Sequence, residues 1–172
     1  MKNFLCSFCN KKHDIFFETE FGLPEVIVKE LDSGELEYES GERWFIIQKK
    51  YFLVKGVIEI PIIDYEKKIK WLVWAMISKE DFFEYTSLFS TNKKANWPKE
   101  GTLAAEMAFL KKSVGLRISL DLKEKNSFPS IKICERDSEL GRMQEEKITM
   151  EGAIKIMELF YHDELKFNGL QV

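Results

Sequence analysis

Three runs rich in β-branched and aromatic residues occupy the middle of the chain, at 44–47, 52–60 and 69–77. Polar turns of hairpin length separate them, which is typical of consecutive antiparallel strands. The third run is apolar on both faces apart from one lysine, which indicates a central, covered strand. A run at 116–122 alternates cleanly between apolar and polar residues, and 131–133 follows as its return strand.

Helices are predicted where the apolar spacing changes from two residues to about 3.6. Ser78, with Asp81 three residues later, forms a capping box and predicts a helix from that point. A second helix is predicted over 102–110, with Gly115 permitting a left-handed stop. Thr149 is the predicted cap of the last helix, whose broad apolar stripe leaves a narrow polar strip. That strip holds Glu151, Lys155, Glu158 and His162.

Together these elements predict an α+β fold, with an antiparallel sheet of about five strands and helices packed on it. The chain has 172 residues, of which 45% are hydrophobic, with 14 Phe and 4 Trp. Surface scaling predicts that about 70% of the unfolded surface is buried on folding, which is enough for one core. We therefore expect one domain over 1–172, with a knuckle and an acidic segment at 1–42 and the α+β core at 43–172.

Charge is unevenly distributed along the chain. The net charge of -3 argues against a general binder of polyanions or of anionic membranes. The segment 14–42 carries ten acidic residues and only Lys29 as a base, whereas 43–70 carries seven bases and three acids. Two interpretations of the acidic segment stay open. It is either a solvated, partly irregular surface or a contact surface for a basic protein partner.

Aromatic residues lie close to lysines between 44 and 74, an arrangement that resembles a stacking platform for single-stranded nucleic acid. Core aromatics beside solvated lysines explain the same pattern, and we expect no nucleic-acid partner. The longest apolar run, Trp71 to Ile77, is too short to span a bilayer. The first residues become polar too soon for a signal peptide. We expect a cytoplasmic protein without a membrane partner.

One motif has chemical content: Cys6-Ser7-Phe8-Cys9-Asn10-Lys11-Lys12-His13. Two residues between the thiolates allow a tight turn to direct both sulfurs at one tetrahedral ion, and His13 can supply a third ligand. The residue after the second cysteine tends to need a positive φ, which Asn10 tolerates well. The motif predicts half of a zinc site resembling a zinc knuckle, while an unmetallated pair and a redox pair remain alternatives.

The sequence leaves more than one interpretation of the fourth ligand open. His162 is the only other imidazole, and Glu158 one turn earlier could orient its ring. Alternatively, His162 is a surface residue paired with Glu158. Cys134 is either a ligand or a free, packed thiol. The predicted metal ligands are Cys6, Cys9, His13 and His162.

A structural zinc is favoured over a catalytic one because no diagnostic general base accompanies the motif. The sequence contains no His-Glu-x-x-His pattern, no glycine-rich phosphate loop and no nucleophile elbow. Our leading hypothesis is a non-catalytic, protein-binding domain with a structural zinc, whose partner binds the 14–42 segment. The alternative is an enzyme, either a zinc-dependent hydrolase with a water as fourth ligand or a thiol oxidoreductase using Cys6 and Cys9.

Three features together resemble domain-of-unknown-function family 2199, a group of bacterial proteins. They are the Cys-x-x-Cys with its following histidine, the segment 52–61 with its Glu-Ile-Pro, and Trp71-Leu72-Val73-Trp74 running into Ser78-Lys79-Glu80-Asp81-Phe82. The likeness spans roughly Phe4 to His162. It implies a small cytoplasmic bacterial protein without an assigned activity.

Two positions depart from the pattern of that family. Asn10 replaces the glycine that usually follows the second cysteine, a change that the tolerance of asparagine for positive φ makes harmless. The family also tends to carry a His-Pro pair after the aspartate that matches Asp137, whereas Ser138 and Glu139 follow here. If that histidine serves a site in the family, this chain lacks it.

Overall fold

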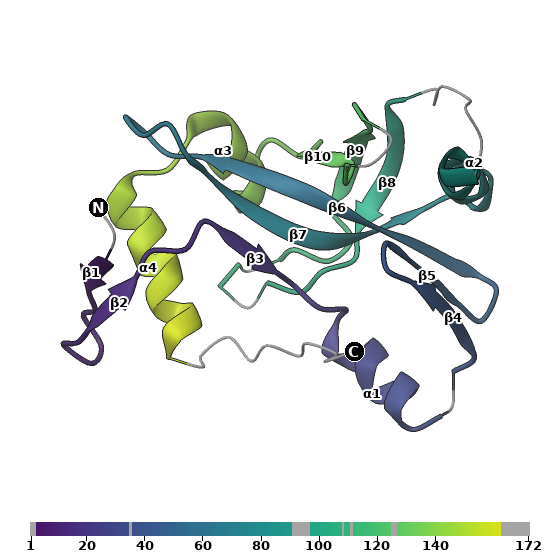
Figure 1. Cartoon of the computed structure of the whole chain (residues 1–172), viewed down its shortest axis with the longest axis horizontal. Coiled ribbons are helices and arrows are strands. Elements are labelled where there is room, and N and C mark those ends of the chain that lie inside the picture. The colour runs from purple at the N-terminus through teal and green to yellow at the C-terminus, as the bar shows by residue number, and fades with distance from the viewer. Residues whose placement is uncertain are drawn as a thin grey trace.

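The computed structural model describes residues 3–34, 36–90, 97–107, 109–110, 112–124 and 127–162. Within them the chain forms a mixed α+β fold with four helices and two sheets (Figure 1). The helices are α1 (Glu25–Asp32), α2 (Lys79–Ser90), α3 (Glu139–Glu146) and α4 (Met150–Tyr161). The strands are β1 (Asn3–Leu5), β2 (Lys12–Asp14), β3 (Glu18–Glu20), β4 (Tyr38–Gly41), β5 (Trp44–Ile47), β6 (Tyr51–Pro61), β7 (Lys68–Ile77), β8 (Lys99–Leu103), β9 (Arg117–Asp121) and β10 (Ser130–Ile133).

The long hairpin of β6 and β7 is the spine of the main sheet (Figure 1). β8 pairs with β7, β9 with β8 and β10 with β9, all antiparallel. β10 then returns to pair with β6 in parallel, through Ser130 opposite Val57 and Ile131 opposite Ile58. These five strands therefore close into a barrel, and no edge remains inside the ring.

Gly56 lies on β6, next to the residues that pair with β10 and close the barrel. A Cβ atom at this position would lie 2.6 Å from Ile131 Cδ1 and 3.0 Å from the Pro129 carbonyl oxygen. Real Cβ atoms do not approach neighbours so closely, so the absence of a side chain allows the two strands to meet here.

Three further strands extend the sheet beyond the barrel. β3 pairs in parallel with β7, whereas β5 pairs with β6 and carries β4 at the outer edge. The two ends of the main sheet, as described, are β3 and β4.

Two apolar clusters account for the packing. The larger one joins the barrel strands to the first hairpin, α2 and α4, and it includes Trp71 (1% exposed) together with Met157 and Phe160 of α4. The smaller one lies beneath α1, where Ile27, Val28 and Leu31 pack on the apolar face of β5 and its neighbours. The members of the smaller cluster are Leu23, Phe45, Ile47, Leu53, Trp74 and Ala104.

The structure confirms the strands predicted at 44–47, 52–60, 69–77, 116–122 and 131–133 to within one or two residues. The antiparallel sheet of about five strands is not confirmed, because the main sheet joins eight described strands, closes on itself and contains two parallel pairings. The predicted aromatic core is confirmed for Trp71 and Trp74, which are 1% and 7% exposed.

Among the helices, Asp81 N–H donates to Ser78 Oγ and Gly152 N–H donates to Thr149 Oγ1, so both predicted caps are confirmed. The helix predicted over 102–110 is wrong. Thr102 and Leu103 end β8, between Met76 and Ala75 of β7 on one side and β9 on the other. The left-handed conformation predicted for Gly115 is confirmed, with φ 83°.

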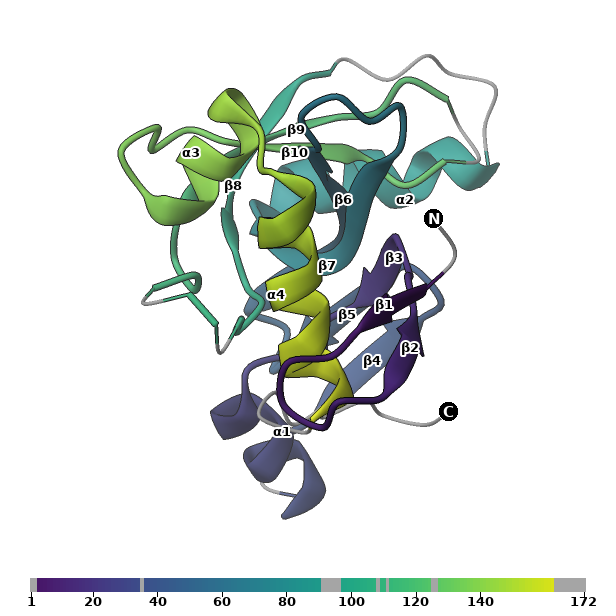
Figure 2. The same ribbon diagram turned by 90° about the vertical axis from the view of Figure 1, so that its left-hand side faces the viewer.

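The first two strands form a separate hairpin that lies against the C-terminal end of α4 (Figure 2). Its pairing places Phe4 opposite His13. Segments from near the two ends of the chain thus meet on one side of the barrel. None of the helices in the described ranges has the length and apolar character needed to cross a bilayer.

Candidate metal centre

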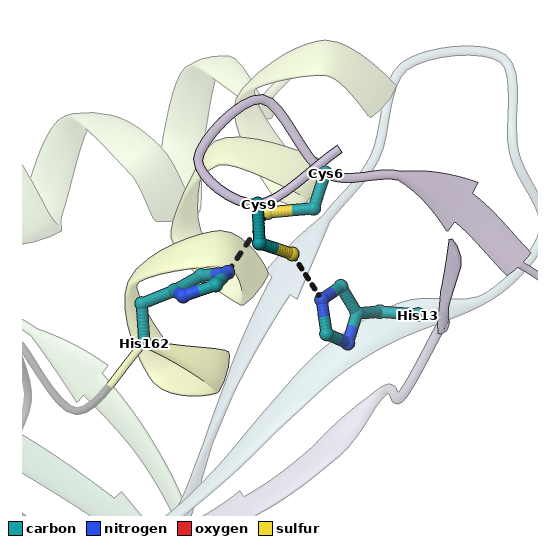
Figure 3. A group of neighbouring side chains, drawn as sticks. All are labelled: Cys6, Cys9, His13 and His162. Carbon is teal, nitrogen blue, oxygen red and sulfur yellow. Dashed lines mark hydrogen bonds between the residues drawn. The ribbon is translucent and has the colours of Figure 1, made fainter. Parts of the chain in front are cut away.

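The turn between β1 and β2 carries the Cys-x-x-Cys motif. Asn10 N–H donates to the Cys6 carbonyl oxygen at 3.0 Å, and Cys6 N–H donates to the Lys11 carbonyl oxygen at 2.9 Å. These two bonds fold the turn back on itself, and Asn10 takes the predicted positive φ, at 58°. Both cysteine side chains consequently lie on the same side of the hairpin as His13, which follows on β2 (Figure 3).

The C-terminal end of α4 supplies the second histidine. His162 is the C-cap residue of this helix. The preceding Tyr161 donates its hydroxyl to the Asp14 carbonyl oxygen at 2.9 Å and places its ring 4.2 Å from the His13 ring. Phe4, 5% exposed, packs against both rings, so aromatic contacts hold the hairpin on the helix.

Four donor atoms converge at this junction (Figure 3). Cys6 Sγ lies 3.0 Å from His162 Nε2, and Cys9 Sγ lies 3.1 Å from His13 Nε2. All four ligand atoms lie within 4.8 Å of one another. Cys6 is buried, whereas Cys9, His13 and His162 are partly exposed, so the group could hold a metal ion close to the surface.

The spacing of these atoms can be compared with a tetrahedral zinc site. Zn–S bonds of about 2.3 Å and Zn–N bonds of about 2.0–2.1 Å give tetrahedron edges of roughly 3.3–3.8 Å. The two sulfur–nitrogen contacts are about half an ångström shorter than such an edge, and the longest separation is at most 4.8 Å. Small rotations of side chains already in contact would therefore reach tetrahedral geometry.

Glu158 of α4 holds the Cys-x-x-Cys turn through hydrogen bonds to Ser7. Although it was predicted on the polar strip of the last helix, its side chain is buried, at 5% exposure. Ser7 donates to it twice, through the backbone N–H and through the hydroxyl at 3.0 Å. The predicted role of Glu158 in orienting His162 is wrong, because its carboxylate accepts from Ser7, while His162 contacts Cys6.

The structure brings together all four predicted ligands, Cys6, Cys9, His13 and His162. Cys134 does not belong to this group, and its exposed thiol also contradicts the prediction of a packed one. The contributions of Ser7 and Tyr161 were not predicted from the sequence. The signal for Glu158 was its place one turn before His162 on the narrow polar strip of the last helix.

A separate ionic cluster links α2 to β8. Lys99 donates to Glu84 at 2.7 Å and pairs with Asp81 at 2.9 Å. Burial works to raise the pKa of Asp81, but hydrogen bonds from Lys99 and Ser78 outweigh it and hold the pKa below its ordinary value. Tyr85 on the same helix is fully buried, and this burial raises its pKa to about 12 despite the opposing charge of Arg43.

The acidic segment 14–42 is divided by the fold. Glu18 and Glu20 on β3 pair with Lys70 at 3.4 Å and Lys55 at 2.6 Å. Five carboxylates on α1, on β4 and beside it are exposed and form no ion pair within the part of the chain that the structure describes. They are Glu30, Asp32, Glu37, Glu39 and Glu42. The side chains of Glu25 and Glu35 lie outside the description.

Comparison with known proteins yields one match. The model of a family described as an uncharacterised protein conserved in bacteria, domain-of-unknown-function family 2199, matches residues 5–148. The matched range contains Cys6, Cys9 and His13 and ends before α4, which carries His162. Neither a curated protein nor a solved structure matches the chain.

Proposed function

This chain belongs to domain-of-unknown-function family 2199, and since that family brings no activity with it, we propose a function from the site itself. Cys6, Cys9, His13 and His162 bind one zinc ion that has a structural role, in a non-catalytic domain that binds another protein. The observation that carries the zinc proposal is the convergence of four donor atoms within 4.8 Å, drawn from the two sides of one junction.

The donor set supports zinc over other metals. Two sulfur and two imidazole nitrogen donors in a tetrahedral arrangement suit Zn²⁺, whereas calcium and magnesium require oxygen ligands. Cysteine binds a metal ion as a thiolate and not as a disulfide, so the proposal places the protein in a reducing compartment such as the cytoplasm. The free cysteines agree with that environment.

The same donor set supports a structural ion over a catalytic one. A catalytic zinc has three protein ligands and keeps one position open for water. Here four protein donors converge, enough to fill all four positions around a tetrahedral ion. The buried carboxylate of Glu158 accepts two hydrogen bonds from Ser7, which leaves it poorly placed to act as a general base on a metal-bound water.

Metal analysis tests the zinc proposal. We expect one zinc per chain in protein purified without added metal, and loss of that zinc in Cys9→Ser. The matched control is Cys134→Ser, which removes an exposed thiol outside the group and leaves the zinc content unchanged. Protein without metal that forms a reversible Cys6–Cys9 disulfide would contradict the proposal and favour thiol chemistry. Zinc with an exchangeable water would favour hydrolysis.

The partner is a basic protein, and the exposed carboxylates of α1 and β4 are the contact surface. In Figure 1 the hairpin and helix that carry the metal centre lie at the left, whereas α1 and β4 lie at the lower right, so a partner bound to α1 and β4 would not contact the metal centre. Attraction between exposed charges weakens with salt because counter-ions screen it.

Charge reversal tests the partner proposal. Glu30→Lys combined with Asp32→Lys should abolish a salt-sensitive complex with a lysine-rich ligand. Glu139→Lys combined with Glu146→Lys changes the net charge equally at exposed positions of α3 and should leave much of the binding intact. Equal losses in the two double variants would show that only the net charge matters and would contradict a defined contact surface.

A further inference from the structure

The outer edge of β4 is a free strand edge. β4 is the last strand of the main sheet and pairs only with β5 among the described residues. Its register places Tyr38 opposite Ile47 and Ser40 opposite Phe45. A free edge offers backbone donors and acceptors to any extended chain that reaches it.

The direction of these backbone groups follows from the ladder. Gln48 N–H donates to the Glu37 carbonyl oxygen at 2.7 Å, so these two residues form a hydrogen-bonded pair. Hydrogen-bonded and non-hydrogen-bonded pairs alternate along an antiparallel ladder. Glu39 therefore faces β5, while Tyr38 and Ser40 direct their N–H and C=O groups away from it. Two donors and two acceptors point outward.

The surroundings of this edge are acidic and partly apolar. Glu37, Glu39 and Glu42 are exposed along it. A hollow of about 440 Å³ borders it, lined by Leu36, Glu37, Tyr38, Glu39, Ile46 and Lys49. The Tyr38 ring is stacked on Phe45 at 5.2 Å and is still 54% exposed, which provides a positioned aromatic surface.

We propose that the outer edge of β4 binds an extended, lysine- or arginine-rich segment of a partner protein as an added strand. The backbone groups of Tyr38 and Ser40 supply the affinity and the glutamates select basic side chains. The proposal rests on the partner binding proposed above and specifies where and how it occurs. A second copy of this chain fits poorly, because its own β4 would bring glutamates against glutamates.

The other end of the sheet provides a comparison. β3 is also an edge strand, but its two carboxylates are paired with Lys70 and Lys55 of the same chain. Its acidic charge is neutralised, so it lacks the attraction for a basic segment that β4 retains.

Amide hydrogen exchange of the full chain tests the proposal. The probe is a ten-residue synthetic peptide of alternating lysine and valine, added at saturating concentration in low salt. We expect exchange of the Tyr38 and Ser40 amides to slow at least tenfold, with little change at Glu39, whose amide already faces β5. A peptide with glutamate in place of each lysine should have no effect.

Ser40→Pro and Ser40→Ala separate strand addition from simple charge attraction. Proline at Ser40 removes an outward N–H and no hydrogen bond to β5, so β4 should remain in the sheet. We expect it to weaken peptide binding at least tenfold, while Ser40→Ala, which keeps the N–H, binds as the native chain does. If Ser40→Pro does not fold, the test of strand addition is the amide exchange of Tyr38 and Ser40 in the native chain, measured with and without the peptide.

The outcomes distinguish this proposal from the partner proposal. Suppose that peptide binding is lost in the Glu30→Lys, Asp32→Lys variant but is unchanged in Ser40→Pro. This result would support the acidic contact surface and contradict strand addition at the edge of β4. Unchanged amide exchange at Tyr38 and Ser40 with the peptide bound would also contradict strand addition at β4. Failure of the peptide to bind even in low salt would overturn both proposals.

Discussion

His162→Ala and His13→Ala each remove one imidazole ligand from the proposed zinc centre. The two histidines, however, close loops of very different length when they bind the ion. His13 lies four residues from its contact Cys9, whereas His162 lies 156 residues from its contact Cys6. In the folded protein this difference is without cost, because the fold already brings each pair together. In the unfolded chain it determines which histidine can stay on the metal.

The magnitude follows from the entropy of loop closure, which grows as (3/2)RT ln n. For separations of 156 and four residues, keeping His162 on the zinc in the unfolded chain costs about 3 kcal/mol more than keeping His13 there. A histidine that binds zinc equally well in the folded and the unfolded chain adds nothing to the free energy of unfolding. A histidine that binds zinc only in the folded chain adds its full binding energy. The zinc-dependent stabilisation should therefore fall by up to about 3 kcal/mol more in His162→Ala than in His13→Ala.

Urea denaturation measures this quantity. For the native chain and each variant, the free energy of unfolding is determined with excess zinc and again with a chelator, and the second value is subtracted from the first. The subtraction removes the packing that each histidine contributes without metal, including the contact of His13 with Tyr161.

Two results would refute the reasoning. Equal losses in the two variants would show that His162 is not released on unfolding or does not bind the metal in the folded state. A native chain whose free energy of unfolding is the same with zinc and with the chelator would refute the metal centre as a whole.

Three further predictions concern the body of the protein. Glu158→Ala leaves the N–H and hydroxyl of Ser7 without their acceptor and should lower the free energy of unfolding by about 1–3 kcal/mol in chemical denaturation. The pKa of Tyr85 is raised to about 12 in the folded state, so its contribution is complete below pH 10 and is lost as the pH rises towards 12. Tyr85→Phe should remove roughly 3 kcal/mol of this alkaline decline, and an unchanged pH profile would contradict the assignment. Gly56→Ala should destabilise by about 1–3 kcal/mol through the closure contact, while Gly152→Ala on α4, whose Cβ would make only ordinary van der Waals contacts with Thr149 and Ile148, should stabilise by about 0.5–1 kcal/mol, both measured by thermal unfolding.

The five strands predicted from the sequence were predictable because their signals are local. Alternation at 117–121 is visible within five residues, and β6 and β7 are consecutive apolar runs joined by one short polar turn. Barrel closure was not predictable, because the parallel pairing of Ser130 with Val57 joins distant segments and has no local pattern. Gly56 is its one trace in the sequence, and an isolated glycine in a strand has several explanations.

The helices show the same limit. The segment 102–110 has the apolar spacing of a helix, but the pairing of Leu103 with Ala75 of β7 overrides it. α1 was missed because its charge dominated the interpretation, although Ile27, Val28 and Leu31 have helical spacing. α3 was missed too, where Ser138 is the N-cap that accepts from Gly141 N–H.

For the metal centre, motif spacing identified three ligands, while His162 followed from being the only remaining imidazole. The sequence could not show that Glu158 is buried, because the hairpin that covers it comes from the other end of the chain. A polar strip on a helix looks the same whether solvent or another segment lies over it. Only docking of the hairpin distinguishes the two cases.

The clasp between the first hairpin and the last helix has a consequence for synthesis on the ribosome. At elongation rates of about 5–20 residues per second, His162 is made roughly 8–30 seconds after Cys6. During that interval the proposed zinc site would have only Cys6, Cys9 and His13 from its own chain, which leaves the fourth position to water or to a small ligand from solution. With zinc bound as proposed, the four-ligand centre would form only after translation has reached His162, and a chain that stops earlier would release the ion more readily to chelators.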